Sequence, residues 1–370
     1  MTRLLTSIRE RVQREARWKR HEESLAELVR THPLRYLFLE ITRRCNLACS
    51  YCGSECGPRG LPGELEAPDW IGVVRQIASD FDSKQVMVAV TGGEPLLKEG
   101  VLELFSELDA LGFRFGMVTN GFFLDAEMAK RVVDTGIGSI SLSMDAPPPV
   151  NDQIRARGAT AKVEEAIVNL KDAGYKGKLE IISTLTRPAI ALLEPMRRYL
   201  SELRVPLWRV APVMPIGRAA RRPDLLPSAE DMRTLLTFVA EARVDGLLPS
   251  PEFCEEGYLG DRFEGVVRPY LSQCRAGITT GGVLATGAIG ACPELGEAFV
   301  QGDIGRERFR EVWETRYQDL RDRSWTRKSA CASCDAYGRC QGGSLHLYSK
   351  PGSELLRCLY QQLDEGPESK

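Results

Sequence analysis

The sequence lacks any apolar run long enough to cross a membrane and any secretion signal at its start. It also lacks a strong excess of charge of one sign, because 49 Lys and Arg residues nearly balance 51 Asp and Glu residues. A chain close to neutrality gives no reason to expect nucleic acid or an anionic membrane surface as an obligatory partner. We therefore expect a cytoplasmic protein with neither kind of partner.

The chain is long and apolar enough to bury a large core. Its 370 residues are 43% hydrophobic, which predicts one large domain with a smaller appendage. Eleven cysteines are present. In a reducing compartment such thiols more often bind metal or do redox chemistry than form structural disulfides.

Residues 1–34 have apolar side chains at helical spacing among many Arg and Lys residues. This pattern predicts an amphipathic helical extension. A basic helix can dock an anionic partner, but a solvated helix packed on the main domain is the favoured interpretation.

Residues 35–215 alternate short apolar runs with longer periodic segments, which predicts strand and helix units around a parallel sheet. The predicted strands are 36–41, 86–91, 114–119, 138–143, 179–185 and 207–213, and the predicted helices lie near 68–80, 99–111, 125–135, 160–174 and 190–203. Six such units favour an α/β fold, a partial (β/α)6 barrel similar to a TIM barrel. Residues 216–265 are interpreted as a last barrel helix and a connector, and residues 266–370 as a Cys-rich domain.

Three cysteines directly follow the first predicted strand, in the spacing Cys45-x3-Cys49-x2-Cys52. Cys56 lies at an odd spacing for a fourth equivalent ligand. The pattern therefore favours an iron-sulfur cluster with one iron left open over a closed tetrathiolate site.

Polar residues also follow the next three strands, and parallel strands bind ligands at their carboxyl ends. The second strand runs into Gly92, Gly93, Glu94 and Pro95, where glycines allow a close backbone approach and the glutamate adds an acceptor. The later strand ends supply Asn120, Ser143, Asp145 and Arg155. Taken singly, each is more often a turn residue or a surface charge.

Together, the cysteine triad with its aromatic Tyr51 and the Gly-Gly-Glu-Pro loop resemble the radical S-adenosylmethionine (SAM) enzymes. The resemblance implies that Cys45, Cys49 and Cys52 bind a [4Fe–4S] cluster whose open iron is chelated by SAM. It implies that Glu94 and the glycine backbone meet the amino group of SAM, with Tyr51 and Asn120 also at the SAM site. Ser143 and Asp145 would lie near the ribose, and Arg155 would pair with the carboxylate. Reductive cleavage of SAM would give methionine and a 5′-deoxyadenosyl radical, with an electron from a reducing partner such as flavodoxin or ferredoxin.

The last hundred residues contain a second set of thiols: Cys274, Cys292, Cys331, Cys334, Cys340 and Cys358. Seen alone, the last four could form a closed zinc site. Beside a radical SAM core, the set resembles the SPASM extension, which carries auxiliary iron-sulfur clusters. Cys331, Cys334, Cys340 and Cys358 match the full ligand set of the outer cluster, and we call them the outer site.

The inner cluster of that extension retains only Cys274 and Cys292 here, which we call the inner site. Ser344 stands where the family pattern has a further cysteine. Cys254, Cys56, Ser344 or the substrate would have to complete the inner site, or the cluster is absent; the sequence leaves these alternatives open.

The resemblance implies an oxidoreductase or maturase that modifies a peptide or protein side chain by crosslinking or dehydrogenation, with an auxiliary cluster accepting the electron. Residues 52–56 and 88–96 look most like maturases associated with tungsten-cofactor oxidoreductases. The alternatives are a small-molecule or tetrapyrrole side-chain dehydrogenase and, from another class, a non-catalytic electron-transfer or scaffold protein. No residue is identified as the acid or base acting on substrate, since Asp335, Tyr337 and His346 near the late cysteines are more often structural or exposed.

Overall fold

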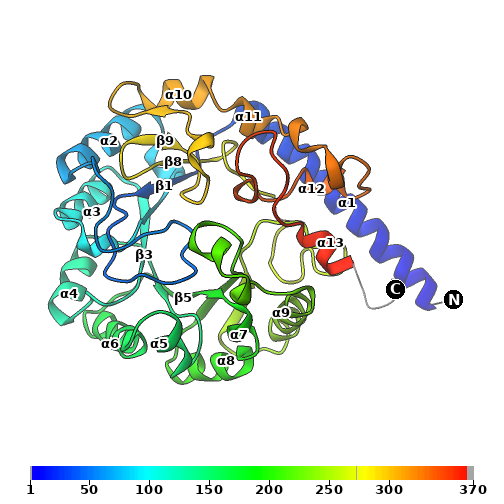
Figure 1. The fold of residues 1–370 in the computed structure, drawn as a ribbon, viewed down its shortest axis with the longest axis horizontal. Helices are drawn as coiled ribbons and strands as arrows, with labels where there is room; N and C mark the ends of the chain where they lie inside the picture. Colours follow the sequence, from blue (N-terminus) through cyan, green and yellow to red (C-terminus); the bar gives the residue numbers. More distant parts are fainter. Residues whose placement is uncertain (1, 272, 365–370) are drawn as a thin grey trace.

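The computed structural model describes residues 2–271 and 273–364. It confirms the six predicted strands and the helices between them, arranged with the strands inside a ring of helices (Figure 1). The strands are β1 (Tyr36–Glu40), β2 (Met87–Thr91), β3 (Arg114–Thr119), β4 (Ser139–Ser143), β5 (Lys178–Leu185) and β6 (Leu207–Pro212). The helices after them are α2 (Ala67–Asp80), α3 (Val101–Ala110), α4 (Ala126–Asp134), α5 (Val150–Ile154), α6 (Ala159–Asp172), α7 (Arg187–Ile190), α8 (Leu193–Glu202) and α9 (Ala229–Ala242). Neighbouring strands from β1 to β6 pair in parallel, as a partial barrel requires.

The sheet is wider than the sequence predicts. β7 (Ser250–Phe253) pairs in parallel with β6, and β8 (Thr280–Val283) pairs in parallel with β1. β9 (Ala288–Gly290) and β10 (Gly302–Asp303) extend the β8 edge in antiparallel fashion, giving ten strands in one sheet. The segment predicted as a connector therefore contains a strand, and the Cys-rich region continues the barrel sheet instead of forming a separate layer.

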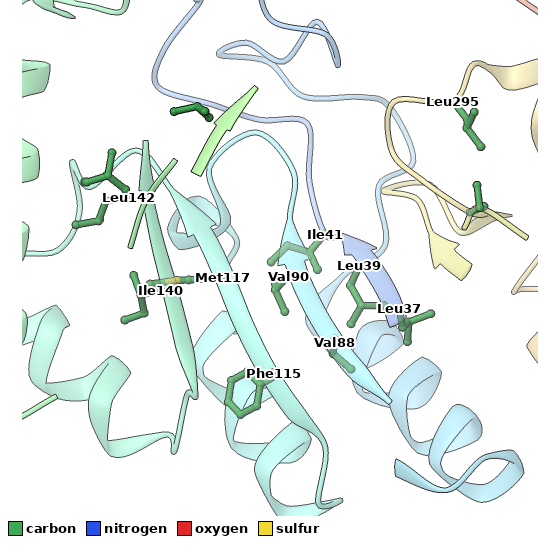
Figure 2. Close-up of a cluster of buried hydrophobic side chains, with 14 of the residues drawn as sticks. Leu37, Leu39, Ile41, Val88, Val90, Phe115, Met117, Ile140, Leu142 and Leu295 are labelled. Atoms are coloured by element: carbon green, nitrogen blue, oxygen red, sulfur yellow. The ribbon is translucent and has the colours of Figure 1, made fainter. Parts of the chain in front are cut away.

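The strands bury one face under the surrounding helices. In β1, Leu37 and Leu39 are fully buried and alternate with Tyr36 and Phe38 on the opposite face. Figure 2 shows the continuation of this layer across β2, β3 and β4, from Leu37, Leu39 and Ile41 through Val88 and Val90, Phe115 and Met117 to Ile140 and Leu142. Burial of this layer at about 25 cal/mol per Å² of apolar surface fixes the strands, so the loops at their carboxyl ends are held in a defined arrangement.

The remaining helices belong to the C-terminal region and to the chain's start. They are α10 (Phe309–Thr315), α11 (Gln318–Arg321), α12 (Tyr337–Cys340), α13 (Leu359–Asp364) and α1 (Thr2–Thr31), and the short 3-10 helices are η1 (Ser83–Gln85), η2 (Pro95–Leu97), η3 (Gly217–Arg221), η4 (Pro223–Leu225), η5 (Glu297–Phe299), η6 (Ser324–Thr326), η7 (Ser329–Cys331) and η8 (Leu345–Leu347).

The predicted N-terminal helix is confirmed, and it packs on the Cys-rich region. α1 runs beside α11 and α12 in Figure 1. Its Trp18 is buried against Tyr258, and Arg339 of α12 binds Glu15 at 2.6 Å while lying over the Trp18 ring. Among the described residues no helix is both long and apolar enough to cross a membrane.

Candidate radical SAM site

The three predicted cluster ligands lie in the long loop between β1 and α2, at the carboxyl end of the sheet. Cys45 is buried, and Cys49 and Cys52 are half-buried. The loop folds back on itself, since the Cys45 amide donates to Gly57 O at 2.8 Å and the Cys52 amide donates to Cys49 O at 3.2 Å. All three thiols border one cleft of about 230 Å³.

Arg218, in η3 after β6, hydrogen-bonds to the cysteine loop at three carbonyl groups. Its guanidinium donates to Cys49 O at 2.7 Å and to Cys56 O at 2.8 Å, and its amide donates to Cys52 O at 3.0 Å. Arg218 could not be found from the sequence, because its partners are backbone carbonyls more than 150 residues away along the chain. The three bonds fix the spacing of the cysteines on the loop.

The cysteines of the triad differ in the direction of their pKa shifts. Burial raises the pKa of Cys45 to about 11. A hydrogen bond from the Cys56 thiol lowers the pKa of Cys52, which favours the thiolate that a metal binds. Cys56 is packed in one cluster with the triad, and its Sγ lies 3.8 Å from Ser54 O. The donor set of three thiols beside one cleft fits a cluster that keeps one iron open.

Gly92 and Gly93 let the second strand-end loop touch the cysteine loop directly. A Cβ on Gly92 would lie 2.2 Å from Thr42 O, and a Cβ on Gly93 would lie 2.3 Å from Arg44 O. Gly92 also has a φ of 144°, which favours glycine. The Gly93 amide donates to Thr42 O at 2.7 Å. Both glycines also line the cleft. The absence of a side chain therefore lets this loop approach the cysteine loop as well as a ligand in the cleft.

Glu94 lies behind the residues that border the cleft. It is fully buried, and its carboxylate accepts hydrogen bonds from Thr119 Oγ1 at 2.7 Å and from the Asn120 amide at 2.8 Å. It is not among the residues that border the cleft. These bonds tie the β2 loop to the end of β3. The assignment of this carboxylate to the amino group of SAM stays a prediction.

Asp145 likewise acts through its neighbours. It is 1% exposed, and its carboxylate accepts from the Tyr51 hydroxyl, from Arg155 Nη1 at 2.7 Å and from the Thr184 amide at 2.7 Å. Tyr51 and Arg155 border the cleft, but Asp145 does not. Arg155 Nε is buried and has no hydrogen-bond partner among the described residues, so this cation retains a donor for an anionic ligand.

The other two predicted residues both border the cleft. Ser143 lies at the end of β4, and Asn120 follows β3. Asn120 Nδ2 donates to Asn46 Oδ1 at 2.8 Å and lies 3.8 Å from Cys45 Sγ. The structure therefore brings Tyr51, Gly92, Gly93, Asn120, Ser143 and Arg155 together with the cysteine triad, at the edge where parallel strands bind ligands.

The four cysteines of the outer site surround a separate small cavity of about 20 Å³, together with Tyr258 and Tyr337. Burial and the other three thiols raise the pKa of Cys340 to about 12. Among the described residues no group of three or more His, Cys, Asp or Glu side chains is placed to hold a single metal ion. Four thiols that border one cavity are a donor set that fits an iron-sulfur cluster.

Sequence reasoning missed Glu294, which enters the cleft from the Cys-rich region two residues after Cys292. Glu294 Oε2 lies 4.0 Å from His346 Nδ1, and its side chain is about half exposed. The only feature of the sequence that pointed to Glu294 was its position two residues after Cys292, a predicted cluster ligand. Of the other polar residues near the late cysteines, Tyr337 bonds to Arg323 O at 3.1 Å, and Asp335 borders a surface groove away from the cleft.

Comparisons with known proteins agree with this site. Residues 39–186 match the Radical SAM superfamily, and residues 274–335 match SPASM, an iron-sulfur cluster-binding domain. The mycofactocin maturase MftC of Mycobacterium tuberculosis is 30% identical over 315 residues, covering 83% of this chain and 77% of the maturase. The AdoMet-dependent heme synthase of Oleidesulfovibrio alaskensis is 25% identical over 349 residues, covering 88% of this chain and 87% of the synthase.

A solved structure of native anSMEcpe with bound AdoMet (SAM) and Cp18Cys peptide has the same fold. Its TM-score is 0.68 at 20% identity, with 90% of this chain and 95% of that chain covered. With a partial barrel, a strand-end cysteine triad and these matches, the chain belongs to the radical SAM superfamily. It is an enzyme of the oxidoreductase and maturase type within it, carries a SPASM domain, and uses SAM, a [4Fe–4S] cluster and one or two auxiliary [4Fe–4S] clusters.

Proposed function

We propose that this enzyme oxidatively modifies a side chain of a peptide or protein, forming a crosslink or a dehydrogenated residue. The observation that carries the proposal is that one cleft is bordered both by the cysteine triad and by Glu294 of the Cys-rich region. A substrate in this cleft meets the radical-generating loop and the auxiliary domain together. MftC, a maturase, and anSMEcpe, whose structure holds a peptide, support this substrate class.

In this proposal Cys45, Cys49 and Cys52 hold the radical SAM cluster. Arg155 binds the SAM carboxylate with its free donor, and Asp145 orients Arg155 and Tyr51. The Gly92 and Gly93 backbone receives the amino group, while Ser143 lies at the ribose and Asn120 stays beside Cys45. Cys331, Cys334, Cys340 and Cys358 hold the outer auxiliary cluster.

When bound, SAM and the cluster on Cys45, Cys49 and Cys52 would supply a 5′-deoxyadenosyl radical able to take one hydrogen atom from the substrate. A cluster held by the outer-site cysteines would supply an acceptor for the second electron, with a proton released from the substrate. The chain's own contribution is to bind and orient these groups and to limit the access of water to the cleft. A flavodoxin or ferredoxin is the proposed source of the electron that cleaves SAM.

The test uses the anaerobically reconstituted full chain, a chemical reductant, SAM and a candidate peptide encoded beside the gene. We expect 5′-deoxyadenosine together with a peptide that has lost two hydrogens, measured by mass spectrometry. Formation of 5′-deoxyadenosine without any change in peptides from the gene's neighbourhood would contradict the substrate class.

The second candidate is oxidation of a tetrapyrrole side chain, which the similarity to the heme synthase favours. The same assay with an iron-porphyrin carrying propionate side chains separates the two. A turnover of the porphyrin that exceeds turnover of every peptide would establish this candidate in place of the first.

A further inference from the structure

Four cysteines remain after the radical SAM triad and the outer site are assigned: Cys56, Cys254, Cys274 and Cys292. A [4Fe–4S] cluster needs four ligands. Whether a third cluster can form at the inner site depends on whether Cys56, Cys254 or Ser344 can join Cys274 and Cys292.

Neither of the two spare thiols is available there. Cys56 is buried in one cluster with the radical SAM triad, and its Sγ lies 3.8 Å from Ser54 O. Cys254 follows β7, and its Sγ lies 3.4 Å from Val210 O of β6, so it is hydrogen-bonded to the barrel backbone.

Ser344 is also engaged. It is 1% exposed, and its hydroxyl donates to Glu255 Oε1 at 2.5 Å. His346 Nε2 lies 3.6 Å from the other oxygen of Glu255. A buried polar group of Glu255, Ser344 and His346 therefore joins the carboxyl end of β7 to the segment between Cys340 and Cys358.

We propose that this chain has no iron-sulfur cluster at the inner site, and that the Glu255, Ser344 and His346 group takes its place and supports Glu294 at the rim of the SAM cleft. The proposal rests on the assignment of the outer site made above. It leaves the outer cluster as the single auxiliary electron acceptor of the enzyme.

The test counts iron and sulfide per chain in the anaerobically reconstituted full-length protein, with Mössbauer spectra to identify cluster type. We expect about eight irons, the content of two [4Fe–4S] clusters. The variant Cys274→Ser/Cys292→Ser should keep all of them, whereas Cys331→Ala/Cys334→Ala should lose about four. About twelve irons in the unmodified protein, or any loss of iron in a folded Cys274→Ser/Cys292→Ser variant, would overturn the proposal.

Since Cys274 is buried, the double variant requires a thermal unfolding measurement beside the count. If it does not fold, Ser344→Ala decides, because it removes the hydrogen bond to Glu255 without adding bulk and should leave iron unchanged. Loss of iron in Ser344→Ala would show that the hydroxyl supports a cluster, against the proposal. Iron counts do not depend on SAM cleavage, so failure of this proposal and failure of the proposed function are distinguishable.

Discussion

Arg155, which borders the cleft, donates to the buried carboxylate of Asp145 behind it at 2.7 Å. The same carboxylate accepts from the Tyr51 hydroxyl, so one buried acid orients the cation and the aromatic ring that border the cleft. Both side chains depend on Asp145 for their position.

We therefore expect Asp145→Asn to weaken SAM binding about tenfold, equivalent to about 1.4 kcal/mol, while the radical SAM cluster stays in place. The amide keeps the shape but loses the charge that holds Arg155. Equilibrium dialysis of SAM against reconstituted protein measures the change. The control is Asp224→Asn, which breaks an exposed pair with Arg222. An unchanged affinity in Asp145→Asn, or an equal loss in the control, would contradict the assigned role.

Gly93→Ala should push the loop after β2 away from the cysteine loop after β1. The added Cβ would lie 2.3 Å from Arg44 O, a backbone atom that cannot move alone. We expect a loss of about 1–3 kcal/mol in the free energy of unfolding and a loss of SAM cleavage.

The matched control is Gly72→Ala in α2, where a Cβ meets nothing within 4 Å. This exposed helical position should gain about 0.5–1 kcal/mol instead. Chemical denaturation of both variants provides the comparison. Equal free energies of unfolding for the two alanine variants would contradict the prediction, because they would show that the loop contact at Gly93 accommodates a Cβ.

The sequence was sufficient for the first six strands because their apolar alternation is local. It missed β7 and β8 because Pro251 and the pair Gly281–Gly282 remove the usual strand composition, and their place depends on pairing with β6 and β1. For the site, the sequence predicted which strand-end loops meet at the cleft. The hydrogen bonds of the Glu94 carboxylate to Thr119 and Asn120 were not predicted, because contacts between loops from different strands have no local signal.

Trp18 should be a main support of the contact between α1 and the outer site. It is 2% exposed and packs in one cluster with Tyr258 and Ala336, beside Cys334 and Cys340. Trp18→Ala should cost about 3–5 kcal/mol if the cavity stays open, and it should shorten the lifetime of the outer cluster in air. Val12→Ala, on the same helix but 61% exposed, is the control. Thermal unfolding and the decay of cluster absorbance measure both effects, and an outer cluster equally durable in both variants would contradict the prediction.

Removal of the outer cluster should separate SAM cleavage from product formation. Cys334 and Cys340 lie in the cavity of the outer site, whereas Cys45, Cys49 and Cys52 border the SAM cleft, so the two sets of thiols are distinct in space. We expect Cys334→Ala/Cys340→Ala to keep forming 5′-deoxyadenosine but to lose the oxidised peptide, because the second electron has no acceptor.

The opposite pattern is expected for Cys45→Ala/Cys49→Ala/Cys52→Ala, which should lose SAM cleavage but keep the outer iron. Cys254→Ala is the control for removal of a thiol, since Cys254 Sγ hydrogen-bonds to Val210 O and belongs to neither set of predicted ligands. This variant should still form both 5′-deoxyadenosine and the oxidised peptide. Mass spectrometry of nucleoside and peptide from one reaction measures the two outcomes together. Oxidised peptide from Cys334→Ala/Cys340→Ala at the unmodified rate would remove the outer cluster from the electron path, and simultaneous loss of all iron in either variant would show that the sites do not assemble independently.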